Sequence, residues 1–170
     1  MESNTNRNNL TYKCTYQSPL GKMILESNQD KLSALYFERQ HSQTKAINVE
    51  NLAIFSQTKK WLDSYFQREI PHFMPPLLLN GSAFALQVWE ILLNIPYGKT
   101  TSYKEIANIL AQKRGIAKMS AQAVGGALKR NKIAIIVPCH RVIGTNATLI
   151  GYNGGIDIKA QLLRLENIII

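Results

Sequence analysis

The sequence has few of the features that would place it outside ordinary globular proteins. It contains only two cysteines among 170 residues, Cys14 and Cys139, which is too few for a disulfide framework and typical of a reducing compartment. No run of about 18 apolar residues occurs, which argues against a membrane span. The polar residues 1–9 lack the apolar core of a signal peptide and predict a flexible tail. We therefore expect a cytoplasmic protein without a membrane partner.

Metal-binding patterns and acidic residues are scarce as well. Cys14, His41 and His72 lack the spacing of a ligand set, so we expect no metal and no cofactor. There are 11 Asp+Glu against 20 Lys+Arg, a net charge of +9. Residues 1–80 hold nine basic and seven acidic side chains, whereas residues 81–170 hold eleven and four. Such a basic surface attracts nucleic acids through counterion release, although it can also serve solubility alone.

Three prolines and a glycine between residues 71 and 81 mark a linker that divides the sequence into two domains. We expect an N-terminal α/β domain over residues 1–80 and a mainly helical C-terminal domain over residues 81–170, so the fold class is α+β. Apolar periodicity and turn residues predict three strands and then a helix in the first domain, at residues 10–16, 22–27, 32–37 and 49–66.

The second domain carries a helix-turn-helix pattern. Helices are expected over residues 83–93, 103–111 and 120–130. Ser102 with Glu105 forms a capping box for the second of these helices, and Ser120 is the N-cap candidate of the third. Two short helices joined by a turn and followed by basic residues are typical of DNA-binding proteins.

The third helix is unusually narrow, since it reads Ala121-Gln122-Ala123-Val124-Gly125-Gly126-Ala127. Glycine in a helix interior costs about 1 kcal/mol relative to alanine. Close approach to another surface would offset that cost. Either DNA or a neighbouring helix of the same protein is the candidate surface.

A cysteine, an imidazole and a guanidinium group come together in Ile135-Ile136-Val137-Pro138-Cys139-His140-Arg141-Val142-Ile143-Gly144. The β-branched run predicts a buried strand that ends at Pro138. A thiol beside His140 and Arg141 is expected to have a lowered pKa, and the thiolate is the form that attacks carbon. The alternative is a buried core thiol beside a surface His-Arg pair.

The stretch Pro138-Cys139-His140-Arg141-Val142, preceded by Asn131 and followed by Gly151-Tyr152-Asn153-Gly154-Gly155, resembles the active-site signature of the O6-alkylguanine-DNA alkyltransferases. The resemblance is strong over about residues 82–166. It is looser in the first domain, where the Ser18-Pro19-Leu20-Gly21 turn and the stretch 61–66 resemble the family's RNase-H-like sheet and helix. It implies a monomeric DNA-repair methyltransferase that moves an alkyl group from guanine O6 in double-stranded DNA to a thiol, once per molecule. O4-alkylthymine stays open as a second substrate.

The resemblance also assigns roles to single residues. Cys139 would be the nucleophile and alkyl acceptor, His140 would remove its proton through a water molecule, and Glu166 would orient the imidazole. Tyr103 would donate a hydrogen bond to the purine, and Asn131 would brace the turn before the cysteine. The residues implied in binding substrate and DNA are Gln122, Ala123, Arg130, Arg141, Val142, Tyr152, Asn153 and Gly154.

Gln122 departs from the family pattern. Because guanine O6 lies inside a stacked duplex, the nucleotide must be extruded before a buried thiolate can reach it. In the family the recognition helix enters the minor groove, and an arginine at this position fills the vacated stack. Glutamine is neutral and shorter, so the departure puts the efficiency of base flipping in doubt and leaves the transfer chemistry intact.

Other classes of protein agree with parts of the sequence. A non-catalytic, alkyltransferase-like DNA-binding protein would lack the cysteine, whereas Cys139 is present. A regulator of the adaptive-response type would need a further metal-binding domain, for which 170 residues leave no room. A cysteine hydrolase is suggested by Cys139, His140 and Glu166 alone, and it would release its product instead of keeping the added mass.

Overall fold

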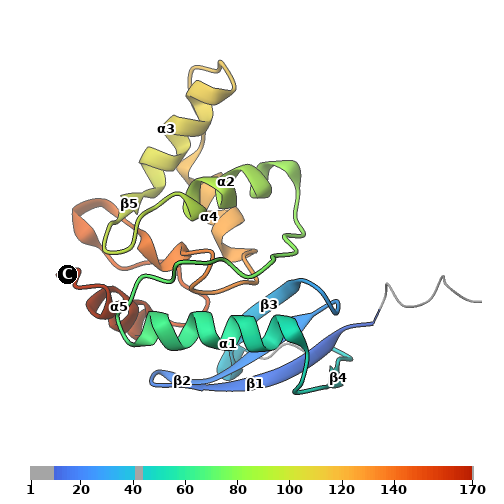
Figure 1. Ribbon diagram of the computed structural model, residues 1–170. Helices are drawn as coiled ribbons and strands as arrows, with labels where there is room; N and C mark the ends of the chain where they lie inside the picture. Colours follow the sequence, from blue (N-terminus) through green and yellow to red (C-terminus); the bar gives the residue numbers. More distant parts are fainter. Residues whose placement is uncertain (1–9, 41–43, 170) are drawn as a thin grey trace, which may run out of the picture. The chain divides into compact units, whose positions relative to one another are not determined.

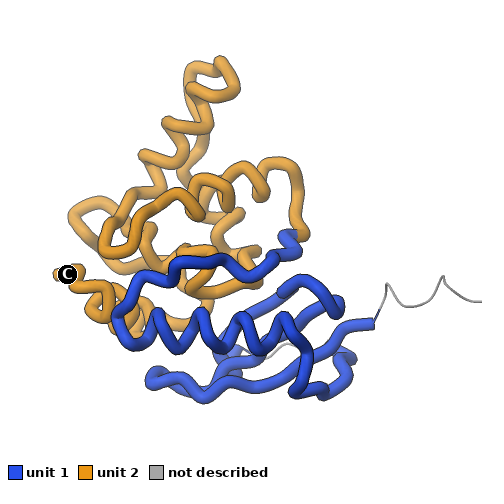
Figure 2. The backbone as a smooth tube through the Cα atoms, in the orientation of Figure 1, with its two compact units in different colours: residues 1–79 blue, residues 80–170 orange. Residues whose placement is uncertain are grey.

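The computed structural model describes residues 10–40 and 44–169, so the flexible tail expected at residues 1–9 lies outside the described residues. The chain forms two compact units, residues 1–79 and 80–170 (Figure 2). The first contains a sheet and a helix and the second is mainly helical, which confirms the α+β fold class. Within the described ranges, every helix falls short of the length and apolar content that a membrane span requires.

The first unit is built on a four-stranded sheet in the order β3-β2-β1-β4. The strands are β1 (Tyr12–Ser18), β2 (Gly21–Ser27), β3 (Leu32–Phe37) and β4 (Ile47–Asn48). The first three are antiparallel neighbours, and β4 pairs in parallel with β1. Ser18 pairs with Gly21 across the first turn, where Gly21 has a φ of 121°, a conformation that favours glycine. The hairpin predicted from the Ser-Pro-Leu-Gly sequence is therefore confirmed, whereas β4 was not predicted.

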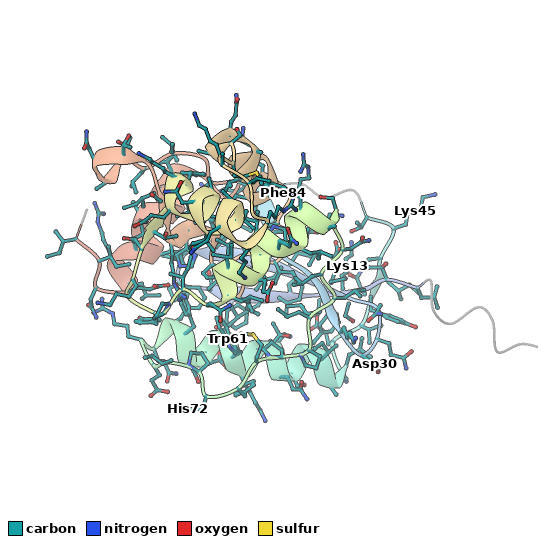
Figure 3. The ribbon with its side chains drawn as sticks, turned by 90° about the horizontal axis from the view of Figure 1, so that it is seen from above. Lys13, Asp30, Lys45, Trp61, His72 and Phe84 are labelled. Carbon is teal, nitrogen blue, oxygen red and sulfur yellow. The ribbon has the colours of Figure 1, made fainter. Side chains whose placement is uncertain are left out.

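Helix α1 (Ala53–Phe66) packs across one face of this sheet (Figure 1). Its apolar stripe buries Phe55, Leu62 and Tyr65 completely, while Trp61, labelled in Figure 3, stacks on Tyr65 with 5.5 Å between ring centroids. The helix begins at Ala53, four residues later than the predicted start. The short 3₁₀ helix η2 (Glu38–Gln40) completes the described elements of this unit.

Four helices form the framework of the second unit: α2 (Ala83–Leu93), α3 (Tyr103–Lys113), α4 (Ala121–Lys129) and α5 (Ile156–Leu165). The side chains of Ser82, Ser102 and Ser120 cap the first three, and Ser102 forms the predicted capping box with Glu105. Helices α3 and α4 are the predicted helix pair. The indole of Trp89 donates to the carbonyl of Ala127 at 3.0 Å, which ties α2 to α4.

Two short strands bring distant parts of the second unit together. Strand β5 (Thr101–Ser102) pairs in parallel with β6 (Val142–Ile143), so Thr101 lies opposite Val142 and Ser102 opposite Ile143. Helix α3 starts directly after β5, and the 3₁₀ helix η3 (Cys139–Arg141) directly precedes β6. The pairing therefore places Tyr103 beside the cysteine segment. A further 3₁₀ helix, η4 (Thr145–Ala147), follows β6.

The prediction of a buried strand before Cys139 is wrong. Residues 133–137 form a tight turn in which the amide of Ile136 donates to the carbonyl of Ala134 at 2.7 Å. Ile135 has a φ of 67°, which costs a β-branched residue about 1–2 kcal/mol. Ile133, Ile135, Ile136 and Val137 are nonetheless almost fully buried, so the apolar run serves the core as a turn rather than as a strand.

Candidate active site

Cys139 opens η3 and is only 8% exposed. Its sulfur accepts a hydrogen bond from Nδ2 of Asn131 at 3.3 Å. The backbone amides of Cys139 itself and of His140 also act to lower the pKa of the thiol. The Cys139 amide donates its hydrogen bond to the carbonyl of Val137 at 2.8 Å.

Burial raises the pKa of the Cys139 thiol, against the opposing effects of the Asn131 amide, the Lys159 charge and the two backbone amides. The lowered pKa expected from the neighbouring His140 and Arg141 is therefore wrong for the resting protein. Desolvation penalises the thiolate more than these neighbours favour it. The resting sulfur is a thiol, and reaction requires a group that takes its proton.

Asn131 braces the turn that carries the cysteine. Its Oδ1 accepts from the amide of Ile133 at 2.9 Å, while Nδ2 donates to the carbonyl of Val137 at 2.9 Å as well as to Sγ. The side chain of Asn131 thus binds both ends of the turn and also the thiol that follows it. These bonds satisfy the backbone amide of Ile133 and the carbonyl of Val137. In a strand, such groups would need partners on a neighbouring strand.

Glu166 is the charged centre of the site and is completely buried at its side chain. Oε1 lies 2.6 Å from Nε2 of His140, and Oε2 accepts from Nε of Arg141 at 2.8 Å and from the amide of Gly98 at 3.1 Å. Burial alone would raise the pKa of this carboxyl, but the hydrogen bonds and charges of His140 and Arg141 lower it to about 2. Glu166 is therefore a carboxylate at every physiological pH.

His140 is completely buried, and burial lowers its pKa even though Glu166 acts in the opposite direction. The imidazole is therefore neutral at pH 7. A carboxylate only accepts hydrogen bonds, so the single ring proton of neutral His140 sits on Nε2, facing Glu166. In this tautomer Nδ1 is the basic nitrogen.

Arg141 points into the protein, which corrects its predicted role in binding substrate or DNA. The residue is 8% exposed, and its guanidinium makes a bidentate pair with Glu166, through Nε at 2.8 Å and Nη2 at 3.0 Å. Nη1 donates to the carbonyl of Ile95 at 2.7 Å, and the group lies over the ring of Tyr97 at 5.8 Å. These nitrogens of Arg141 donate to groups inside the protein. Arg141 therefore orients the carboxyl group of Glu166 and keeps it ionised.

Tyr103, the first residue of α3, lies at the entrance to the site. Its hydroxyl donates to the carbonyl of Ile150 at 3.1 Å, and its pKa is raised by burial and by the nearby Cys139 charge. Gly151 has a φ of 63°, and a Cβ there would lie 2.8 Å from the Tyr103 hydroxyl. Glycine is required at residue 151 both for the backbone and for this contact.

A cavity of about 720 Å³ lies against Tyr103 and the glycine face of α4. Its wall comes from α3, α4 and the segment after β6, and includes Tyr103, Gln122, Gly125, Gly126, Ile150 and Gly151. Cys139 is not part of this wall. Tyr103 is the residue common to the cavity and to the surroundings of the thiol.

Two family models together match most of the chain. The DNA binding domain of 6-O-methylguanine DNA methyltransferase matches residues 83–168, and the ribonuclease-like domain of the same proteins matches residues 11–79. The chain belongs to this methyltransferase family. The second match also confirms the RNase-H-like character expected for the first domain.

Individual relatives match over nearly their whole length. The methylated-DNA–protein-cysteine methyltransferase of Methanosarcina acetivorans is 39% identical over 91% of this chain and 97% of its own. That of Mycobacterium leprae is 44% identical over 88% of each chain. A crystal structure of Mycobacterium tuberculosis OGT in complex with DNA has a TM-score of 0.80 and 42% identity, over 91% of this chain and 92% of its own.

The other residues predicted for this methyltransferase site lie in two groups. Gln122, Ala123 and Arg130 are exposed on or next to α4, where solvent and large ligands can reach them. Val142 is the first residue of β6 and is buried. The remaining ones lie on the segment between β6 and α5, where Tyr152 and Gly154 are buried and Asn153 is exposed. Nδ2 of Asn153 donates to the carbonyl of Lys129 at 2.6 Å, which links that segment to the end of α4.

Sequence reasoning missed Lys159 of α5. This lysine is fully buried, and its Nζ donates to the carbonyls of Val142 at 2.5 Å and Ile150 at 2.7 Å. A usable signal was present, since Lys159 shares the apolar face of its helix with Leu162 and Leu163, three and four residues on. Among the described residues, no group of three His, Cys, Asp or Glu side chains has the arrangement of a metal site.

Proposed function

We propose that this chain repairs double-stranded DNA by moving the alkyl group of an O6-alkylguanine to Sγ of Cys139. The observation that carries this proposal is the arrangement around the thiol, where Asn131 aligns the sulfur and a neutral His140 is held by Glu166. The membership in the 6-O-methylguanine DNA methyltransferase family supports the choice of substrate. O4-alkylthymine carries a comparable alkyl ether and is the second substrate to assay.

In the proposed reaction His140 takes the thiol proton at Nδ1, through a water molecule, while Glu166 stabilises the imidazolium that forms. The thiolate then forms a bond to the alkyl carbon as the bond from that carbon to O6 breaks. The bonding electron pair passes to the guanine, which finally takes up the proton that the thiol lost. Tyr103 supports the departing base by donating its hydroxyl hydrogen, which requires it to exchange the Ile150 carbonyl for the purine.

One turnover follows from the chemistry of the product. The electrophile is a saturated carbon, so the reaction forms a thioether and needs no oxyanion hole. A thioester would be hydrolysed, but a thioether offers water no ready leaving group. The protein is therefore consumed in stoichiometric amounts by the reaction it performs.

The base reaches the thiol by extrusion from the duplex, with α4 as the helix that approaches the minor groove. Gly125 and Gly126 line the cavity beside this helix. A Cβ at either residue would meet only ordinary van der Waals contacts inside the protein, the nearest at 3.8 Å and 3.7 Å. Tight internal packing therefore does not explain these glycines, which favours an external surface as the reason for the slim helix.

The proposed function is tested with a duplex that contains one O6-methylguanine with a labelled methyl group. The label should move to the protein, and Cys139→Ser should abolish this transfer while binding of the duplex stays nearly unchanged. Label that leaves the protein again, with repeated turnover, would indicate a cysteine hydrolase. Label retained by the Cys139→Ser variant would contradict the proposal.

Base flipping is tested at Gln122. The free base O6-benzylguanine needs no extrusion, so Gln122→Arg should accelerate transfer from duplex DNA several-fold and leave the rate with the free base unchanged. A factor of ten corresponds to about 1.4 kcal/mol in the limiting step. Single-turnover rates at saturating DNA separate this effect from tighter binding by an added charge. Equal acceleration of both substrates, or none with duplex, would contradict the role of Gln122.

A further inference from the structure

The segment that joins α3 to α4 is longer than the turn of an ordinary helix-turn-helix, which has about three or four residues. Helix α3 ends at Lys113 and α4 begins at Ala121, so they are connected by residues 114–120, the α3–α4 loop. The end of α3 and this loop project beyond the rest of the second unit (Figures 1 and 2). The side chains of residues 112–118 are all exposed, so the extra length adds little to the core.

Backbone hydrogen bonds fix the start of the α3–α4 loop. The amide of Gly115 donates to the carbonyl of Gln112 at 3.1 Å. The next amide, that of Ile116, donates to the carbonyl of Ala111 at 3.0 Å. Together with the φ of 64° at Gly115, these two bonds form the Schellman pattern that closes many helices. The loop therefore leaves α3 in one defined direction.

Arg114 ties the same end of the loop to α2. Its Nε donates to Oε1 of Gln87 at 3.0 Å, and its guanidinium lies over the ring of Phe84, 5.3 Å from the centroid. Both partners belong to α2. A loop that is ordered before binding loses less conformational entropy when a ligand binds to it. The α3–α4 loop is therefore prepared to hold its other charged side chains against a partner.

The charges on the loop and beside it are positive. No Asp or Glu occurs between Glu105 and Asp157. Lys113 is the last residue of α3 and Lys118 lies within the loop, and both are exposed. Neither ammonium group forms an ion pair with a described residue. Exposed cations without acidic neighbours attract a polyanion.

Lys118 lies beside the end of α4 that carries Gln122. It precedes the N-cap of this helix, Ser120, by two residues and precedes Gln122 by four. Gln122 also lines the cavity of about 720 Å³ next to Tyr103. A duplex that lies along α4 therefore continues past Gln122 toward the α3–α4 loop.

Two exposed apolar side chains, those of Ile109 and Ile116, raise a protein as the alternative partner. The core of a protein interface is depleted in lysine, however, and single apolar side chains are normal on any protein surface. A surface that carries lysines and is continuous with the helix proposed to approach DNA fits a nucleic acid better.

We propose that the α3–α4 loop is a second contact to the DNA backbone, in which Lys113 and Lys118 bind phosphates that flank the extruded nucleotide. The inference rests on the proposed function, since it extends the DNA surface of α4. Each ammonium group displaces condensed counterions from the duplex, so the contact is independent of base sequence. It strengthens the binding of the duplex and takes no part in the bond changes at Cys139.

The first experiment compares two double variants that lose the same charge. Lys113→Gln with Lys118→Gln should weaken binding of an unmodified duplex by about tenfold or more at about 0.1 M salt, and should reduce the slope of log K against log salt concentration by about 1.8. Lys31→Gln with Lys60→Gln removes two exposed lysines of the first unit and should change neither quantity. Reaction with free O6-benzylguanine, which needs no duplex, checks that each variant is folded.

An unchanged slope in the loop variant would overturn the proposal and favour a protein partner for the loop. An equal change in both double variants would also overturn it, because net charge alone would then explain the result. A reduced slope in a protein that takes no methyl group from O6-methylguanine would overturn the proposed function and leave this inference standing.

The second experiment uses the unmodified protein, and it decides the matter if the loop variant does not fold. Exposed lysines are acetylated with and without saturating duplex, and the modified peptides are quantified by mass spectrometry. Bound duplex should slow the acetylation of Lys113 and Lys118 several-fold and leave Lys31 and Lys60 as reactive as before. Equal acetylation of Lys113 and Lys118 in both samples would overturn the proposal.

Discussion

Glu166 receives hydrogen bonds from His140, Arg141 and the amide of Gly98. Its pKa of about 2 in the folded protein lies below the ordinary value of 4.5. Between these two pKa values, at pH of about 2 to 4.5, the unfolded chain binds more protons than the folded one. The stabilisation by the carboxylate is therefore complete above about pH 4.5 and is lost as the pH falls toward 2.

Glu166→Gln should lower the free energy of unfolding by about 3–5 kcal/mol at pH 7, because it leaves Arg141 as an uncompensated buried charge. The difference from the unmodified protein should narrow as the pH falls from 4.5 toward 2. Urea unfolding at several pH values measures this. Glu105→Gln is the control, since glutamine also serves a capping box and should cost little. A difference in the free energy of unfolding that stays constant down to pH 2 would contradict the account of Glu166.

The contact between Gly151 and Tyr103 can be separated from backbone strain. Gly151 and Gly115 have φ values of 63° and 64°, but only at Gly151 would a Cβ meet the Tyr103 hydroxyl, at 2.8 Å. Alanine at either residue should cost about 1–2 kcal/mol in unfolding free energy from the left-handed conformation. Only Gly151→Ala should also slow alkyl transfer, as single-turnover kinetics would show. Equal transfer rates for the two variants would mean that the placement of the Tyr103 hydroxyl does not matter.

At the level of elements, the local signals of the helices could be read in the sequence, and long-range partners could not. Ser102 with Glu105 and Ser120 marked the starts of α3 and α4 because capping is decided within a few residues. The apolar run before Cys139 was misread as a strand, because the hydrogen bonds of Asn131 that fold it into a turn cannot be seen in periodicity. Arg141 was assigned to substrate or DNA binding from the family resemblance, and its partner Glu166, 25 residues away, could not be seen in the local pattern.

Helix α4 allows a test in which stability and function move in opposite directions. Gly126→Ala should raise the free energy of unfolding by about 0.5–1 kcal/mol, because the interior of the protein has room for the methyl group and glycine weakens a helix. The same change should weaken transfer from duplex DNA and leave the reaction with free O6-benzylguanine unchanged. Thermal unfolding and single-turnover rates measure the two effects. Undiminished duplex repair would show that the narrow helix does not serve DNA.

At the level of the whole molecule, the excess of basic residues is concentrated in the second unit, with eleven Lys+Arg against four Asp+Glu over residues 81–170. Duplex affinity should therefore fall steeply with salt, with a slope of about −0.9 per phosphate contacted in a plot of log K against log salt concentration. Fluorescence anisotropy with an unmodified duplex measures this slope. An affinity that is flat between low and moderate salt would exclude the electrostatic part of the account.

The central claim is that Cys139 keeps the alkyl group that it removes from DNA. Intact-mass analysis and peptide mapping, after incubation with excess duplex containing O6-methylguanine, test it most directly. The account predicts a mass gain of one CH₂ per chain, located on the peptide that contains Cys139, with no further guanine restored after every chain has reacted. Guanine restored while Cys139 stays unmodified would contradict it.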